Sequence, residues 1–298
     1  MSFSKIKALS WDRNFKDFTY KSKGRMDICI HSIFKRVINI SSAEKILYTI
    51  SNISTDNAPY TMKIDFSGNF NETIVKEDRI IIGDESIIIG NLKIELSEVD
   101  LWSPIGKKST DYSISNIENN IKLFNSLIIE NGENGGCKDY YLKNFLNING
   151  HMQSPIEEEL SKRIEIFYKS LLANSLNKEH VKNLIGLGIG LTPSGDDFLT
   201  GFLASIYKFE KNNEIHSRIS QFVYPLLYST TDISAAMLKA AIEGKYRETL
   251  HGFIHSFLES DNDSFIKSFK NMLSIGSSSG TDLSIGVVLA LQYTLNNQ

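Results

Sequence analysis

The stretch GLGIGLTPSGDDFLT, residues 186–200, decides the fold of the chain's second half, because four glycines, a proline and two adjacent aspartates interrupt a helical pattern. Thr192 is a residue type that often caps a helix, and Pro193 suits the first helical position, where its missing N–H costs nothing. Apolar residues then recur at helical spacing as far as Ile206. The stretch therefore predicts a loop that leads into a helix.

The same loop has features of a ligand-binding segment. Gly188 and Gly190 allow the backbone to approach a ligand closely, and a helix start leaves N–H donors that suit an anion such as phosphate. Asp196 and Asp197 would repel a phosphate unless a cation or a substrate N–H lay between them. An amide-bearing or metal-bridged substrate satisfies both features. The alternative is that the glycines only allow tight helix packing and the aspartates only cap the helix.

The pattern at this helix start occurs again further along the chain. SGDDFLTG at 194–201 is matched by SGTDLSIG at 279–286, and more loosely by STTDISAA at 229–236. Each copy has a hydroxyl residue, an aspartate three positions later, and a small residue four positions beyond the aspartate. This order is typical of a polar helix start with a small residue one turn inside. We therefore hypothesise that three helix starts converge on one polar pocket.

Three motifs together resemble the signature of the AllH family. They are GLGxGLTPSGDD at 186–197, TTxxS at 230–234 and GxSSGxD at 276–282. Ile189 departs from the pattern, because the family usually has proline there. The resemblance extends over most of the chain, and the family includes a subunit of the oxamate carbamoyltransferase of anaerobic allantoin degradation. It implies a carbamoyltransferase subunit of purine nitrogen catabolism, whose substrates include carbamoyl phosphate or a small amide acid and which acts with different partner subunits.

The resemblance and the motifs together indicate the candidate site residues. The aspartates would bind amide or carbamoyl N–H groups or hold a cation, and the hydroxyl groups would donate to substrate oxygens. His31, in the first β-branched run, would carry a proton or stabilise an oxyanion, unless it is only a structural strand histidine. The candidate catalytic residues are Asp196, Asp197, Asp232, Asp282 and His31. The candidate substrate-binding residues are Gly188, Gly190, Thr192, Ser194, Gly195, Thr231, Ser234, Ser278, Ser279, Gly280 and Thr281.

Two other functions fit the same residues. Clustered aspartate, serine and threonine at helix starts also describe an oxygen-ligand site for Mg²⁺, so a magnesium-dependent hydrolase is one alternative. No cofactor is required by the sequence, and no metal ligand set is assigned. The other alternative is a non-catalytic scaffold of the complex, whose pocket is only an interface.

Composition excludes several classes of partner. The chain has 35 acidic and 32 basic residues among 298, so it lacks the basic surface expected of a protein that binds nucleic acid or an anionic membrane. The two cysteines, Cys29 and Cys137, are far apart and suggest a reducing compartment. No apolar run is long enough to span a membrane. We expect a cytoplasmic protein with small-molecule and protein partners; self-association into a homo-oligomer stays open.

The order of sequence patterns predicts an α+β protein. Residues 1–25 are polar and basic and suggest an N-terminal arm. Residues 26–110 contain short β-branched runs separated by turn residues, which predict a mainly antiparallel sheet or barrel. Residues 111–298 predict a larger helical domain that carries the glycine-rich motif, and its 154–157 segment has the pattern of a capping box.

Overall fold

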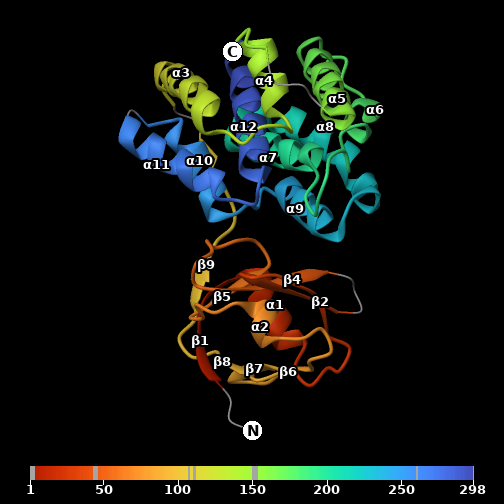
Figure 1. The fold of residues 1–298 in the computed structure, drawn as a ribbon, viewed down its shortest axis with the longest axis vertical. Helices are drawn as coiled ribbons and strands as arrows, with labels where there is room; N and C mark the ends of the chain where they lie inside the picture. Colours follow the sequence, from red (N-terminus) through yellow and green to blue (C-terminus); the bar gives the residue numbers. More distant parts are fainter. Residues whose placement is uncertain are drawn as a thin grey trace. The chain divides into compact units, whose positions relative to one another are not determined.

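The computed structural model describes residues 4–42, 46–106, 108–109, 112–149, 154–259 and 261–297, with Ser4 and Glu210 described by their backbone alone. The chain divides into two compact units between Pro104 and Ile105. A β-rich unit is followed by a larger helical unit, so the fold class expected from the sequence is confirmed (Figure 1). The two units are described separately.

The N-terminal unit is a mixed sheet of nine strands that curls around two helices (Figure 1). Phe15 and Phe18 of the first helix are buried, and the ring of Phe18 stacks on Tyr48 at 3.9 Å between centroids. The strand order is β2-β3-β4-β5-β1-β8-β7-β6, with β9 also paired to β1. The elements are β1 (Ser4–Asp12), α1 (Arg13–Lys21), β2 (Cys29–Ile33), β3 (Val37–Ser41), β4 (Leu47–Ser51), β5 (Thr61–Ile64), α2 (Phe70–Thr73), β6 (Ile80–Ile82), β7 (Ser86–Ile89), β8 (Leu92–Glu95) and β9 (Asp100–Trp102).

The first strand joins the two halves of this sheet. Its early residues pair in parallel with β8, and its later residues pair with β5 and β9. The expected arm over residues 1–25 is therefore corrected: β1 and α1 occupy most of it, while Met1–Phe3 lie outside the described residues. Lys5 and Lys7 gave the segment a basic appearance, but they alternate with the buried Ile6 and Ala8, which is the pattern of a half-buried strand.

The boundary between the units lies earlier than the expected position of 110/111. Ile105 forms an isolated bridge with Lys245, and Ser109 forms one with Phe209, so this segment is part of the helical unit. Thr110 and Asp111, on either side of the expected boundary, lie outside the described residues.

The helical unit has α7 and α12 at its centre, with other helices around them (Figure 1). The capping box expected at the start of α5 is present, because Ser154 and Glu157 each accept from the other's backbone N–H. No helix in the described ranges is long and apolar enough to cross a membrane. The elements are α3 (Ile114–Asn131), α4 (Lys138–Phe145), α5 (Pro155–Leu172), α6 (Lys178–Lys182), α7 (Ser194–Lys208), α8 (Asn213–Val223), α9 (Asp232–Ile242), α10 (Glu248–Ser256), α11 (Asn262–Leu273) and α12 (Ser279–Asn296), with 3₁₀ helices η1 (Glu210–Asn212) and η2 (Tyr224–Ser229).

Two glycines bring the backbones of α7 and α12 into direct contact. A Cβ added to Gly201 of α7 would lie 2.1 Å from the carbonyl oxygen of Leu283 on α12. A Cβ added to Gly286 of α12 would lie 2.2 Å from the carbonyl oxygen of Phe198 on α7. The contact is reciprocal, because both glycines hold the last position of the repeated eight-residue pattern and both carbonyls hold the fifth. The starts of α7 and α12 are therefore fixed side by side.

Candidate active site at the starts of α7 and α12

The glycine-rich loop folds back against the start of α7. Gly188 has φ +138°, and a Cβ there would lie 2.4 Å from the backbone nitrogen of Ser194. Gly190 has φ +99° and open space where its side chain would be. Helix α7 begins at Ser194 with Pro193 as its N-cap, one residue later than expected. The Thr192 hydroxyl does not cap this helix; it forms a 2.8 Å hydrogen bond with the hydroxyl of Ser279.

The first backbone N–H groups of α7 are already paired. Gly195 donates to the carbonyl of Leu187 at 2.8 Å, and Asp196 and Asp197 donate to the carbonyl of Pro193. The outward-pointing donors expected from the sequence are therefore engaged within the protein at these three positions. The helix start as it stands does not offer them to a phosphate.

The start of α12 is built in the same way. Helix α12 begins at Ser279, the first residue of the repeated pattern, with Ser278 as its N-cap. A Cβ on Gly280 would lie 1.9 Å from the carbonyl oxygen of Met272, and a Cβ on Gly195 would lie 2.1 Å from that of Leu184. Both glycines therefore face protein backbone, which accounts for them by packing without a ligand.

Asp197 is a buried carboxyl group without a hydrogen-bonding partner. Its exposed fraction is 1%, and neither carboxyl oxygen has a partner among the described residues. Burial raises the pKa of Asp197 well above its usual range, and the charge of Asp282 adds to the rise. The hydroxyls of Ser279 and Thr192 lie near enough to oppose it.

Asp282 is equally buried, with an exposed fraction of 0%. One of its oxygens accepts the backbone N–H of Cys137 at 2.7 Å, and the other has no partner in the described part of the chain. Burial raises the pKa of Asp282 to about 6, while the Cys137 N–H and the nearby side chains of Ser194, Cys137 and Ser278 lower it.

The two aspartates form a reciprocal arrangement with two serines. The side chain of Ser194, at the first position of α7, lowers the pKa of Asp282 on α12. The side chain of Ser279, at the first position of α12, lowers the pKa of Asp197 on α7. The thiol of Cys137 completes the group, since its Sγ donates to the carbonyl of Ser194 at 3.7 Å. Burial and the charges of both aspartates raise the pKa of this thiol well above its usual range. We call these five residues the paired-aspartate cluster.

Cys137 and its neighbour Gly136 are not among the site residues expected from the sequence. A Cβ on Gly136 would lie 2.4 Å from Oδ1 of Asp282, so only glycine fits against the carboxyl group. Glu133 in the same loop donates its backbone N–H to the Thr281 hydroxyl at 3.0 Å. The adjacent Gly135 and Gly136 are the available signal in the sequence, because glycine allows the backbone to approach another group closely.

Asp196 connects three segments of the helical unit. One of its oxygens accepts the backbone N–H of Gly186 at 2.9 Å, and the other accepts the hydroxyl of Thr230 just before α9. Burial raises its pKa, and these bonds oppose the rise. Both oxygens are thus used within the protein, which gives Asp196 a structural role in holding the start of α9 against that of α7.

The third helix start, that of α9, remains at the surface. Helix α9 begins at Asp232 with Thr231 as its N-cap, and the Thr231 hydroxyl accepts the N–H of Ser234 at 3.1 Å. Asp232 is exposed and lies outside the buried cluster, whereas Ser234 is buried. The start of α9 contacts the start of α7 through the Thr230 hydroxyl, which donates to Asp196, and contacts the glycine-rich loop through the Thr231 hydroxyl, which donates to the carbonyl of Leu191.

His31 lies in the N-terminal unit. It is the extra residue of a β-bulge in β2, since Ile30 pairs with Ile40 and Ser32 pairs with Asn39. Its Nδ1 lies 3.1 Å from the Ser32 hydroxyl, which also accepts from the Asn39 amide at 3.0 Å. Bulges re-aim side chains and are frequent near active sites. A catalytic role for His31 stays a prediction.

The paired-aspartate cluster suits an uncharged, amide-like ligand. A neutral carboxyl group both donates and accepts a hydrogen bond, which is the complement of a primary amide or carbamoyl group. Burial favours this neutral form because it disfavours the charged one. Within the described ranges, no group of three or more His, Cys, Asp or Glu side chains is placed to hold a metal ion.

Comparison with known proteins matches both units to one family. Residues 184–291 match the family model described as oxamate carbamoyltransferase subunit AllH. Residues 7–101 match the model of the AllH family N-terminal domain. No solved structure matches the chain. The first match contains both helix starts of the paired-aspartate cluster, and together the two matches cover most of the chain.

Proposed function

The chain belongs to the AllH family, and from this premise we propose that it is a subunit of an oxamate carbamoyltransferase-like enzyme. The proposed reaction interconverts carbamoyl phosphate and oxamate with oxalurate and phosphate, in the breakdown of allantoin and other purine nitrogen compounds. The enzyme acts in the cytoplasm, and different partner subunits complete it. The family match supports the reaction class, and the buried carboxyl groups support a role in recognising the carbamoyl group.

The observation that carries the proposal is the pair of unpartnered oxygens on Asp197. A buried polar group without a partner costs about 1 to 3 kcal/mol, so such a group in a native protein calls for an explanation. A bound carbamoyl or amide group would supply the missing hydrogen-bonding partners. The neutral Asp197 carboxyl would donate to the ligand's carbonyl oxygen and accept from its N–H.

The same contacts would assist carbamoyl transfer. The amide nitrogen of oxamate attacks the carbonyl carbon of carbamoyl phosphate, the nitrogen loses a proton, and phosphate leaves with the bonding electrons. Negative charge develops on the carbonyl oxygen during attack. A donor already aimed at that oxygen stabilises the transition state, and holding both reactants in place lowers the barrier further. Asp197 is the proposed donor, with the partly unpartnered Asp282 beside it.

Asp197 is only 1% exposed, so a substrate can reach it only after a neighbouring segment moves. The loop carries two apolar side chains at the surface, Ile189 with 79% and Leu191 with 52% exposed. Its glycines leave the backbone free to move at 188 and 190. We propose that this loop opens to admit the carbamoyl compound, or is held open by a partner subunit.

The test is to recover the chain with its partners from the native host and to measure phosphate-dependent cleavage of oxalurate. Asp197→Asn should lower kcat on the order of 10²-fold or more with the same partners bound and the melting temperature retained, because it removes the acidic donor while keeping the shape. Asp263→Asn, an exposed first-turn aspartate of α11, is the matched control.

Two outcomes would contradict the proposal. If the recovered complex formed no carbamoyl phosphate from oxalurate, the reaction would be a different one. If Asp197→Asn retained full turnover, the chain would serve the complex as a scaffold, or its site would lie elsewhere. Thermal stabilisation by Mg²⁺ that Asp197→Asn abolished would instead favour the magnesium-dependent hydrolase.

A further inference from the structure

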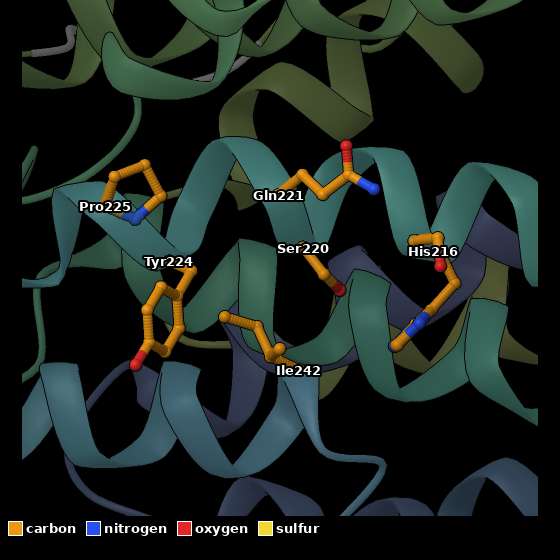
Figure 2. Close-up of a pocket in the computed structure, with 7 residues that line it drawn as sticks. His216, Ser220, Gln221, Tyr224, Pro225 and Ile242 are labelled. Atoms are coloured by element: carbon orange, nitrogen blue, oxygen red, sulfur yellow. The ribbon is translucent and has the colours of Figure 1, made fainter.

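A second ligand-sized space lies in the helical unit, along α8, η2 and the end of α9. It has a volume of about 470 Å³, within the range of small-molecule sites, which is roughly 300 to 1,000 Å³. Figure 2 shows His216, Ser220 and Tyr224 on the side of this helical segment that faces Ile242, while the Gln221 amide points away from it. We call this space the α8 groove. It shares no lining residue with the paired-aspartate cluster.

Two polar groups in the α8 groove are buried and unpartnered. His216 and Ser220 are each 9% exposed, and both line the groove. Nε2 of His216 and Oγ of Ser220 have no hydrogen-bonding partner among the described residues. The two residues are four apart on α8 and therefore share one helix face. Two such groups on one groove wall indicate that the groove holds a ligand with hydrogen-bonding atoms of its own.

The surroundings of His216 determine its charge and the hydrogen-bonding role of Nε2. Burial lowers the pKa of His216, the positive charge of Lys108 lowers it further, and a hydrogen bond with the backbone of Ala241 opposes the change. The ring is therefore neutral near neutral pH, so one of its nitrogens carries the proton and the other accepts a hydrogen bond. With the proton on Nδ1, the unpartnered Nε2 accepts a hydrogen bond, which requires a donor from the ligand.

The remaining walls of the groove are largely apolar. Tyr224 is 62% exposed at the rim, next to the exposed Pro225, and Ile242 lies on the facing side. An aromatic or aliphatic body can lie against these side chains. Ser220 can give or accept a hydrogen bond, so a ligand that pairs with both polar groups must carry an N–H donor beside an acceptor oxygen.

We propose that the α8 groove binds a small uncharged carboxamide or ureido compound with an apolar body. Its N–H donates to Nε2 of His216, its carbonyl oxygen accepts from the hydroxyl of Ser220, and its apolar part lies between Tyr224 and Ile242. The site is separate from the paired-aspartate cluster, so the proposal does not depend on the proposed function.

The test uses three probes of similar shape against the purified full-length chain. Benzamide has both the N–H donor and the carbonyl, acetophenone lacks the N–H, and benzoate carries a negative charge. Ligand-detected NMR titration should give the tightest binding with benzamide. In protein-detected NMR spectra, benzamide should also shift the imidazole signals of His216, which are identified by their absence in His216→Phe.

Substitutions then locate the binding. Ser220→Ala should weaken benzamide binding by roughly 3- to 10-fold through loss of one hydrogen bond. His216→Phe, which can keep the edge contact with the ring of Tyr207 at 5.2 Å, should weaken it at least as much. Ser264→Ala, at an exposed position of α11 outside the groove, is the matched control and should change little.

Three results would overturn the proposal. One is that benzamide does not bind at millimolar concentration, which would indicate that His216 and Ser220 are hydrogen-bonded by water alone. Another is equal or tighter binding of benzoate, which would make the groove an anion site. The last is unchanged binding in Ser220→Ala and His216→Phe, which would place the probe elsewhere.

Discussion

The starts of α7 and α12 have buried aspartates, whereas the start of α9 has an exposed one, although all three carry the same local pattern. Asp197, Asp282 and Asp232 hold the same position in the three copies, yet only the first two are buried. The difference lies in the glycines. The two buried copies have glycine at their second and last positions, and all four of these glycines pack against a carbonyl oxygen.

The third copy has Thr230 and Ala236 at the corresponding positions. Side chains at these positions do not allow backbones to approach as closely as glycine does, and Asp232 at this helix start is exposed. The aspartate is therefore common to all three helix starts, while the glycines are found only at the two starts that form a buried site.

The largest expected effect comes from adding a side chain at the contact between α7 and α12. In Gly201→Ala the new Cβ would lie 2.1 Å from a carbonyl oxygen, so the two helices must separate. We expect the free energy of unfolding, measured in urea by circular dichroism, to fall by about 3 kcal/mol or more.

Gly252→Ala in α10 is the control, because the nearest atom would be 3.8 Å from its Cβ. Alanine's higher helix propensity should there raise stability by up to about 1 kcal/mol. If both substitutions changed stability alike, the glycines would not explain the burial of the two aspartates.

The next effect concerns the pH dependence caused by Asp282. Its folded pKa of about 6 lies above the usual 3.8, so the folded state holds the proton more tightly than the unfolded state does. The stability from this proton is full at pH values below the usual pKa and is lost as the pH rises through about 6. The free energy of unfolding of the wild type should therefore fall, relative to that of Asp282→Asn, by up to about 3 kcal/mol between about pH 4 and pH 7.

Urea unfolding of the two proteins across this range measures the difference. Asn at 282 keeps an oxygen for the Cys137 N–H, so the substitution tests the titration and not that hydrogen bond. Parallel curves for the two proteins would show that Asp282 has an ordinary pKa and that its burial does not distinguish it from Asp232.

A smaller effect is expected at the contact between the third helix start and the first. Thr230→Val removes the hydroxyl that donates to Asp196 and leaves a buried carboxyl oxygen unpaired. We expect a loss of about 1 to 3 kcal/mol in the free energy of unfolding. Thr230→Ser keeps the hydroxyl and should retain most of the stability; an equal loss in both variants would assign the effect to the side-chain methyl group.

The smallest effect is expected at Asp232 itself. Asp232→Asn removes a charge from an exposed first turn, where the helix dipole favours it by less than about 1 kcal/mol. The melting temperature should therefore change by a few degrees at most. A loss as large as that expected from Thr230→Val would mean that Asp232 belongs to the site after all.

Local sequence patterns predict much of the fold, but they do not predict contacts between residues that are far apart in the sequence. The capping box before α5 and the turns between β6, β7 and β8 depend on neighbouring residues, so the sequence shows them directly. The bond from Cys137 to Asp282 joins residues 145 positions apart. No local pattern encodes such a contact, which is why the cysteine was missed.

The candidate site was predicted in part for the same reason. The repeated pattern indicated which helix starts carry the polar groups, and two of the three are adjacent. The close contact of Gly195 and Gly280 with backbone carbonyls could not be inferred, because a glycine that faces a ligand and a glycine that faces a carbonyl look alike in sequence. The separate roles of Asp196 and Asp197 depend likewise on the partners that the fold brings to each.

The central position of β1 has a consequence for how the N-terminal unit folds during synthesis. This strand is made before its partners β5, β8 and β9, and Lys5 pairs with Lys93. The sheet cannot be completed until β9 (Asp100–Trp102) has left the ribosome. Until then β1 presents unpaired backbone groups, and pairing across such long separations is slow. The nascent chain therefore passes through a period in which β1 is the strand most exposed to misassembly.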